Sequence, residues 1–340
     1  MSLPIRVLVV DDSAFARKVV REVLSRDPEI EVVGIARDGL DAVEKIRELE
    51  PDVVTLDLVM PHLDGVEVLH ALRGRPRPRC VVVSTADEHS PLAIKALQAG
   101  AIDVVHKPTA LATERLYELS AELVQKVKIA AAARLPLQSS TGEAYDVRAA
   151  GSAIEIVVIG TSTGGPQALT RLFGALPRDF PVPIVAVVHM PVGYTKALAE
   201  RLNADCRIAV VEAYDGALLR PGLAVIGQAG RHIKIVGEPR EARVKLDVLP
   251  LDTLHRPAVD VLFASAAQIY GRNARGVVLT GMGEDGLQGS RAIHAAGGSV
   301  LAEAESSCVV YGMPRAVIEA GVSKGSVPLE AMAAALLWMP

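Results

Sequence analysis

Short apolar runs alternate with amphipathic stretches along nearly the whole chain, and this alternation constrains the fold more than any other feature. In the first half, the apolar runs occupy residues 6–10, 32–36, 53–56, 80–84 and 103–105. Stretches with helical periodicity lie between them, at residues 14–25, 41–49, 92–99 and from about 113 onward. Such alternation is typical of a parallel sheet whose connecting helices cover both faces. We therefore predict an α/β fold for this half, a flavodoxin-like doubly wound sheet of five parallel strands.

The alternation stops after the first half and resumes near residue 154. The intervening LPLQSSTGEAYDVRAAGS is rich in small and polar residues, as linkers are. A chain of 340 residues also exceeds the size at which one hydrophobic core keeps growing. We predict a first domain over residues 1–125, a helix end and linker over 126–152, and a second doubly wound, mainly parallel α/β domain over 153–340. The second domain is expected to contain a hairpin-like region at residues 223–247.

Composition argues against several functional classes. The formal net charge of −4 supplies no basic field for nucleic-acid phosphates, so nucleic acid is not an expected partner. Three widely spaced cysteines without a CxxC pair predict neither a disulfide framework nor a zinc site. The start of the chain lacks the pattern of a signal peptide, and no apolar run reaches transmembrane length. We expect a cytoplasmic protein without membrane insertion.

Acidic residues follow two of the predicted strands in the first domain. Asp11 and Asp12 end the first strand and Asp57 ends the third, so the three carboxylates are expected to meet at one edge of the sheet. Such a cluster repels itself unless a cation occupies it, and its hard oxygen ligands suit Mg²⁺. Lys107, in HKP after the fifth strand, would pair with the phosphate on a phosphorylated Asp. A single Asp at a strand end can equally be a helix cap, but the set together is not explained by capping.

The motifs VVDDSAFAR, DLVMPHLDG, VVVST and DVVHKP occur in this order over roughly residues 4–125. Together they resemble the receiver domain of bacterial response regulators. The resemblance implies that Asp57 is the phosphoacceptor, that Asp12 and more indirectly Asp11 hold Mg²⁺ beside it, and that Lys107 contacts the phosphoryl group.

The resemblance also implies a hydroxyl residue after the fourth strand that contacts the phosphoryl group. Ser84 is the assignment, and the neighbouring Thr85 is the alternative, because both residues follow the same strand. The Lys107-Pro108 bond resembles the cis X-Pro bond of this family.

In the second domain, a serine lies in a glycine-rich turn. The apolar run 154–159 is followed by GTSTGGPQAL, which places Ser162 between a strand and a helix that Pro166 begins. Glycines allow close approach of a ligand, and a helix N-terminus offers free N–H groups to a developing oxyanion. The same features describe a phosphate-cradling loop, but the Lys of GxxxxGK[ST] and the spacing of GxGxxG are missing.

Two further residues complete a candidate catalytic set with Ser162. His189 ends the apolar run IVAVVH, and Asp285 lies in GMGEDG after the run GVVLT, so all three side chains are expected at one sheet edge. A lone histidine there is commonly a packing residue, and a lone aspartate commonly belongs to a turn. Together they predict that His189 accepts the proton of Ser162 while Asp285 orients the imidazole. The order Ser, His, Asp and the absence of GxSxG argue against the α/β-hydrolase fold.

The motifs GTSTGGPQAL, VVHMP, HRPAVDVLF, LTGMGEDG and SSCVVYGMPR, over residues 154 to about 322, resemble the catalytic domain of CheB-type protein-glutamate methylesterases. The resemblance implies hydrolysis of glutamate γ-methyl esters on the cytoplasmic helices of chemoreceptors, with release of methanol and without a cofactor. In some members it also implies deamidation of receptor glutamines. Ser162 would form the acyl intermediate, and the N–H groups of Thr163 and Met282 would form the oxyanion hole.

The remaining histidines receive lesser roles. His232 and His255 match motif positions of the same family, and we predict a supporting role in the cleft for both. Five others are predicted to be surface or packing residues, namely His62, His70, His89, His106 and His294.

A receiver fused to an enzyme predicts control by phosphorylation, with a histidine kinase as the phosphodonor. The unphosphorylated receiver is expected to cover or constrain the active site. Two alternatives are a DNA-binding response regulator, which would need a basic helical output domain, and a non-enzymatic scaffold. The α/β pattern with GTSTGG argues against the first, and the complete Ser, His and Asp set against the second.

Overall fold

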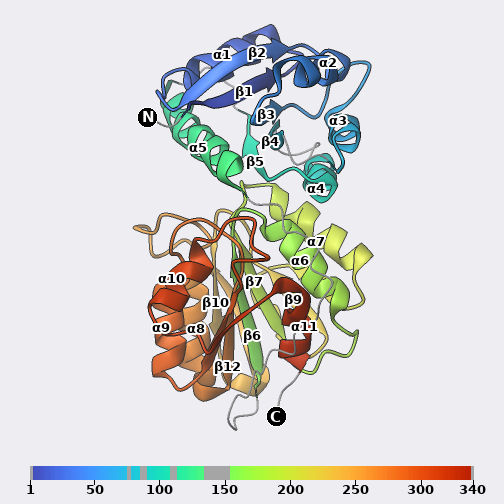
Figure 1. Cartoon of the computed structure of the whole chain (residues 1–340). Helices are drawn as coiled ribbons and strands as arrows, with labels where there is room; N and C mark the ends of the chain where they lie inside the picture. Colours follow the sequence, from blue (N-terminus) through green and yellow to red (C-terminus); the bar gives the residue numbers. More distant parts are fainter. Residues whose placement is uncertain (1–2, 75–77, 85–89, 108–112, 134–153, 338–340) are drawn as a thin grey trace. The chain divides into compact units, whose positions relative to one another are not determined.

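The computed structural model describes residues 3–74, 78–84, 90–107, 113–133 and 154–337 (Figure 1). Contacts divide the chain into two compact units, Met1–Ala133 and Arg134–Pro340. The division falls within the range 126–152 that the sequence analysis assigns to a helix end and linker. Residues 134–153 lie outside the described residues, so the exact domain boundaries stay a prediction.

The first unit contains one parallel sheet of five strands in the order β2-β1-β3-β4-β5, which confirms the predicted fold. Its strands are β1 (Ile5–Val10), β2 (Ile30–Ala36), β3 (Val53–Leu56), β4 (Arg79–Ser84) and β5 (Asp103–His106). Its helices are α1 (Ala14–Leu24), α2 (Gly39–Leu49), α3 (Gly65–Ala71), α4 (Ser90–Ala99) and α5 (Thr113–Ala132). Helices α1 and α5 pack together on one face, while α2, α3 and α4 pack in sequence on the other.

Helix α3 was not among the predicted helices of this unit. It has only seven residues, too few for a helical period to stand out in the sequence. A capping box begins it, in which Asp64 accepts a hydrogen bond from the Glu67 N–H and the Glu67 carboxylate accepts one from the Asp64 N–H. Local capping rather than amphipathic periodicity therefore marks this helix.

The second unit is built on a sheet of seven parallel strands in the order β14-β13-β12-β6-β7-β9-β8. The strands are β6 (Ile156–Thr161), β7 (Ile184–Val188), β8 (Ala209–Glu212), β9 (Leu223–Ile226), β12 (Ala274–Val278), β13 (Ser299–Glu303) and β14 (Gly325–Val327). Because the chain leaves β6 first towards β7 and later returns on the β12 side, the sheet has a topological switch point at β6.

Helices cover both faces of this second sheet (Figure 1). Helices α8 (Val259–Tyr270), α9 (Leu287–Ala295) and α10 (Met313–Glu319) pack against one another on one face. Helices α6 (Gly165–Ala175), α7 (Tyr194–Asp205) and α11 (Leu329–Leu337) lie on the other. All residues of β6, β7, β12 and β13 are buried, as expected for strands covered on both faces.

The predicted hairpin-like region is shorter than expected. Strands β10 (His232–Val236) and β11 (Arg243–Asp247) pair antiparallel, but β9 belongs to the main sheet between β7 and β8. All four residues of β9 are buried. Strands β10 and β11 contain exposed and partly exposed residues, and they form a small two-stranded sheet of which β10 packs against helix α8. A continuous apolar run thus marks the buried strand and separates it from the hairpin.

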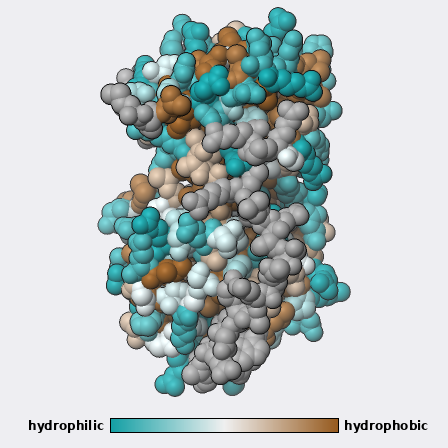
Figure 2. Space-filling model, in the orientation of Figure 1, coloured by the Kyte–Doolittle hydropathy of each residue, from teal (hydrophilic) through white to brown (hydrophobic). Residues whose placement is uncertain are grey.

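The described residues on the face drawn in Figure 2 are largely polar. Small groups of apolar residues lie between them. Among the described residues, no helix combines the length and the apolar composition that crossing a bilayer requires.

Candidate functional site

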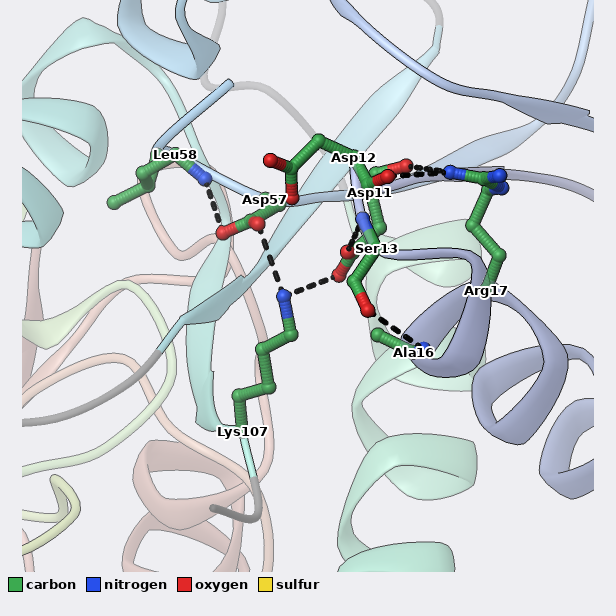
Figure 3. Close-up of polar contacts among 8 residues, drawn as sticks. All are labelled: Asp11, Asp12, Ser13, Ala16, Arg17, Asp57, Leu58 and Lys107. Carbon is green, nitrogen blue, oxygen red and sulfur yellow. Dashed lines mark hydrogen bonds and ion pairs between the residues drawn. The ribbon is translucent and has the colours of Figure 1, made fainter. Parts of the chain in front are cut away.

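The acidic residues of the first unit meet at the carboxyl edge of its sheet. Asp11 and Asp57 follow the neighbouring strands β1 and β3, and Lys107 follows β5. The Lys107 Nζ lies 2.6 Å from Asp11 Oδ2 and 3.0 Å from Asp57 Oδ2 (Figure 3). One carboxylate oxygen from each of Asp11, Asp12 and Asp57 lies within 4.8 Å of the others. The structure therefore brings together four of the residues that the sequence assigned to this site.

Burial and charge oppose each other in this corner. Burial, helped by the neighbouring Asp57 charge, raises the pKa of Asp11 even though Lys107 acts against it. Burial acts against the charged form of Lys107 as well, but the two carboxylates outweigh it and raise the pKa of Lys107. The ammonium therefore neutralises part of a carboxylate pair whose charges would otherwise repel each other.

The donor set fits a hard divalent cation. Asp11 and Asp57 are almost fully buried while Asp12 is exposed, an arrangement that leaves one side open to water ligands. The receiver fold implies Mg²⁺ at this place, and Asp12, Asp11 and Asp57 would hold it through carboxylate oxygens. Backbone N–H groups already fix two of these carboxylates, since Asp11 accepts from Ser13 and Asp57 accepts from Leu58.

The remaining predicted residues of this site are only partly described. Ser84 ends β4, is buried, and pairs in register with His106 immediately before Lys107. Thr85 and Pro108 lie outside the described residues, so the choice between Ser84 and Thr85 and the cis bond before Pro108 stay predictions.

In the second unit, Ser162, His189 and Asp285 follow three adjacent strands. Ser162 comes directly after β6, His189 directly after β7, and Asp285 lies in the turn between β12 and α9. His189 Nε2 lies 2.8 Å from Asp285 Oδ2. The backbone N–H of His189 donates to the backbone carbonyl of Thr161, 3.1 Å away. This hydrogen bond connects the histidine to the residue before Ser162.

The Asp285 carboxylate is held from two sides. Besides His189, it accepts the N–H groups of Val259 at 2.8 Å and Asp260 at 2.9 Å, at the start of α8. Burial would raise the pKa of Asp285, but these hydrogen bonds and the nearby imidazole outweigh it and hold that pKa below its usual range. Asp285 is therefore an anion that fixes the imidazole.

The Asp285 contact assigns different roles to the two nitrogens of His189. An ionised carboxylate only accepts hydrogen bonds, so the neutral imidazole carries its proton on Nε2 and a lone pair on Nδ1. No described residue forms a hydrogen bond with this buried Nδ1. The arrangement can therefore use Nδ1 as the base for a proton from a hydroxyl.

The predicted oxyanion residues belong to two segments, the one that contains Ser162 and the one that contains Gly281. Thr163 follows Ser162 in the chain and is buried, and Met282 follows Gly281. A Cβ atom on Gly281 would lie only 2.8 Å from Ser162 Cβ, so a side chain cannot be accommodated at that position. Gly281 therefore allows the segment after β12 to approach the serine closely.

Two histidines that the sequence placed only in a supporting role shape the surroundings of His189. The His255 ring stacks on the His189 ring, with centroids 3.9 Å apart and an interplanar angle of 24°. His232 is fully buried, accepts the Ala258 N–H at Nδ1 and has Nε2 3.0 Å from the Pro250 carbonyl oxygen. His232 thus fixes both ends of the segment that carries His255.

The contact of the α8 N-terminus with Asp285 was not predicted from the sequence. The signal was present in HRPAVD, where a helix start follows directly after His255. Among the histidines predicted to lie at the surface or to pack, His62, His70 and His294 are exposed and His106 is half-buried, whereas His89 lies outside the described residues.

A change of Asp12 and a change of Lys107 should affect Mg²⁺ binding in opposite directions. Asp12→Asn removes a carboxylate ligand and should weaken binding by about tenfold or more. Lys107→Ala removes the cation that pairs with Asp11 and Asp57, and should tighten it. Titration calorimetry with MgCl₂ measures both. Tighter binding by Asp12→Asn, or weaker binding by Lys107→Ala, would contradict this description of the site.

His232 should make folding stability depend on pH. Burial and the charges of Arg256 and Lys234 lower the pKa of His232, although Pro250 and Asp247 act in the opposite direction. As the pH falls through about 6.5, the unfolded chain binds a proton at this residue before the folded chain does, so the unfolding free energy should fall.

An NMR titration of the imidazoles measures the His232 pKa directly. Urea unfolding between about pH 7 and pH 5.5 should show a weaker pH dependence in His232→Gln than in the wild type. His294→Gln, at an exposed position, is the matched control. A His232 that titrates above its ordinary range would refute the expectation.

Comparisons with known proteins agree with the two predicted domains. The sequence profile of the CheB methylesterase matches residues 157–336, and that of the response regulator receiver domain matches residues 7–119. The chain is 60% identical to a protein-glutamate methylesterase/protein-glutamine glutaminase of Myxococcus xanthus over 98% of this chain and 97% of that protein. It is 44% identical to a protein of the same description from Geobacillus kaustophilus, over 98% of both chains.

A solved structure agrees with the second unit. The crystal structure of the CheB methylesterase catalytic domain of Thermotoga maritima superposes with a TM-score of 0.53 at 40% sequence identity, covering 55% of this chain and 98% of that one. Together, the matches cover both predicted halves and confirm the resemblance seen in the sequence. The chain therefore belongs to the CheB methylesterase family, with a response regulator receiver domain preceding the esterase domain.

Proposed function

We propose that this chain is a phosphorylation-activated protein-glutamate methylesterase that hydrolyses glutamate γ-methyl esters on chemoreceptors to glutamate and methanol. The observation that carries the proposal is the hydrogen bond between His189 and Asp285, at the sheet edge where Ser162 also lies. The names of the relatives, which include both protein-glutamate methylesterase and protein-glutamine glutaminase, support the substrate class.

The proposed reaction uses Ser162 as the nucleophile. His189 Nδ1 accepts the hydroxyl proton as Ser162 Oγ bonds to the ester carbonyl carbon, and the Asp285 anion stabilises the imidazolium. The N–H groups of Thr163 and Met282 would stabilise the oxyanion, a contribution typically worth about 10²–10³-fold in rate per donor. Methoxide leaves with the imidazolium proton as methanol, and a water molecule then hydrolyses the acyl-enzyme to glutamate and free Ser162.

The same residues support deamidation of glutamine. In that case the amide nitrogen leaves with the imidazolium proton as ammonia, and the acyl-enzyme formed on Ser162 is the same. Hydrolysis again releases glutamate. The product is glutamate in both reactions, so one active site can convert two kinds of neutral side chain, the methyl ester and the amide, into the same anionic one.

The receiver unit supplies the control. Asp57 would accept a phosphoryl group from a histidine kinase, with Mg²⁺ supplying charge neutralisation when it is bound, and Lys107 and Ser84 would contact the phosphoryl oxygens. Phosphorylation would shift the population towards a state in which substrate reaches Ser162. Chemoreceptor cytoplasmic helices are the proposed substrate, and a cytoplasmic location is part of the same proposal.

Replacing the nucleophile should abolish nearly all activity. Ser162→Ala should lower methanol release from methylated receptor by about 10⁴-fold or more, because the acyl intermediate on Ser162 Oγ can no longer form. The exposed Ser326→Ala on β14 is the matched control and should keep wild-type activity. A Ser162→Ala variant that retained most of its activity would overturn the assignment.

Replacing the phosphoacceptor should separate basal from stimulated activity. Asp57→Asn should release methanol at the basal rate but fail to respond to a small-molecule phosphodonor such as acetyl phosphate, measured in the full chain with Mg²⁺. Asp38→Asn, where asparagine can still cap α2, should keep the response. Stimulation of Asp57→Asn equal to that of the wild type would rule out Asp57 as the input.

A further inference from the structure

One buried residue outside the Ser–His–Asp set holds the backbone around the nucleophile. The Thr280 carbonyl oxygen accepts the Ser162 N–H at 3.0 Å and the Thr161 hydroxyl at 2.7 Å. The Thr280 hydroxyl lies 3.0 Å from the Thr163 carbonyl oxygen and can donate to it. Thr280 therefore binds the residues before, at and after the nucleophilic position.

The same threonine anchors the segment that approaches Ser162 from the other side. Its hydroxyl accepts the Val310 N–H at 3.0 Å, and the next residue, Gly281, donates its N–H to the Val310 carbonyl. The Gly281 carbonyl in turn accepts the Met313 N–H at 2.8 Å. Gly281 immediately precedes Met282, so both proposed oxyanion residues are attached to positions that Thr280 restrains.

A buried carboxyl group holds Thr280 from behind. Glu303 ends β13, next to β12, and its side chain is fully buried. Its Oε2 accepts the Thr280 N–H at 2.8 Å, and its Oε1 accepts the Ser307 hydroxyl at 2.9 Å. The Ser307 hydroxyl oxygen also accepts the Leu329 N–H at the start of α11. A continuous set of hydrogen bonds thus extends from α11 to the nucleophile turn.

Burying this carboxyl group is energetically unfavourable, which makes its presence informative. Burial raises the pKa of Glu303 to about 7, although the hydrogen bonds from Thr280 and Ser307 act in the opposite direction. The Glu330 charge adds to the increase in pKa, whereas Arg171 opposes it. An apolar side chain would fill the position without this desolvation cost, but it would leave the Thr280 N–H buried without an acceptor.

We propose that Glu303, acting through Thr280, is a positioning residue that holds Ser162 and the two flanking oxyanion peptides in reactive geometry. Without the carboxyl oxygen, the Thr280 N–H must find another acceptor, which shifts the segment after β12. That shift moves the Ser162 N–H and the Met282 peptide together, because both are attached to this segment. A displacement of about 1 Å in a reacting group can cost about 10²-fold in rate.

The test uses two pairs of variants in the full chain, and it rests on the proposed function. Glu303→Leu removes the acceptor and Glu303→Gln retains one, while Thr280→Val removes the hydroxyl and Thr280→Ser retains it. Glu303→Leu and Thr280→Val should lower kcat for methanol release by about 10–100-fold with KM unchanged. Glu303→Gln and Thr280→Ser should restore kcat to within about threefold of the wild type.

Ser299→Ala is the matched control for loss of stability alone. Ser299 begins β13, pairs in register with Arg275 of β12, and accepts the Arg275 Nε hydrogen bond, so it joins the same two strands at their opposite ends. It should lower stability while leaving kcat at the wild-type value. If Glu303→Leu is no more impaired in kcat than Ser299→Ala, the proposal is wrong. If Glu303→Leu does not fold, Glu303→Met, which has a similar volume to Glu and also lacks the acceptor for the Thr280 N–H, takes its place in the same comparison with Glu303→Gln and Ser299→Ala.

A second readout distinguishes failure of this inference from failure of the proposed function. The rate of Ser162 labelling by a fluorophosphonate reports nucleophile reactivity without the natural substrate. Slower labelling in Glu303→Leu and Thr280→Val, with recovery in the conservative variants, supports positioning even if the wild type releases no methanol. Equal labelling rates in all variants would overturn the positioning role, whatever the natural substrate is.

Discussion

Both sites depend on one constraint, that neighbouring parallel strands end at the same edge of a sheet. In the first unit this edge brings Asp11 and Asp57 within hydrogen-bonding distance of Lys107, although the aspartates lie far from the lysine in the sequence. In the second unit, β6 lies between β7 and β12, so the residues that follow these strands share an edge at the switch point. The strands themselves are apolar and buried, and the functional side chains follow the last residue of each strand.

Buried charge imposes the second constraint, and the molecule meets it with hydrogen bonds. In the receiver unit, the Lys107 ammonium forms ion pairs with two carboxylates. In the esterase unit, the Asp285 carboxylate accepts hydrogen bonds from three donors. Glu303 is held by two donors, one of which is the peptide that leads to the nucleophile turn. The buried carboxyl groups therefore fix backbone segments as well as contributing charge.

The sequence predicted much of this arrangement, and its errors have physical reasons. The parallel sheets and the strand ends that carry Asp57, Ser162 and His189 followed from apolar runs whose period and length are local properties. The capping box of α3 and the separation of β9 from the hairpin were missed, because short elements carry little periodic signal. The stacking of His255 on His189 joins residues from separate segments, and no local pattern encodes it.

The sequence by itself determined the two α/β units, their order and the residue types that follow their strands, because burial on both faces demands continuous apolar runs. The tertiary structure alone decided which of those residues touch. The contacts of Asp285 with the start of α8, and of Glu303 with Thr280, join segments about 25 positions apart in the chain. Such contacts depend on strand order and register, which arise only when the whole sheet assembles.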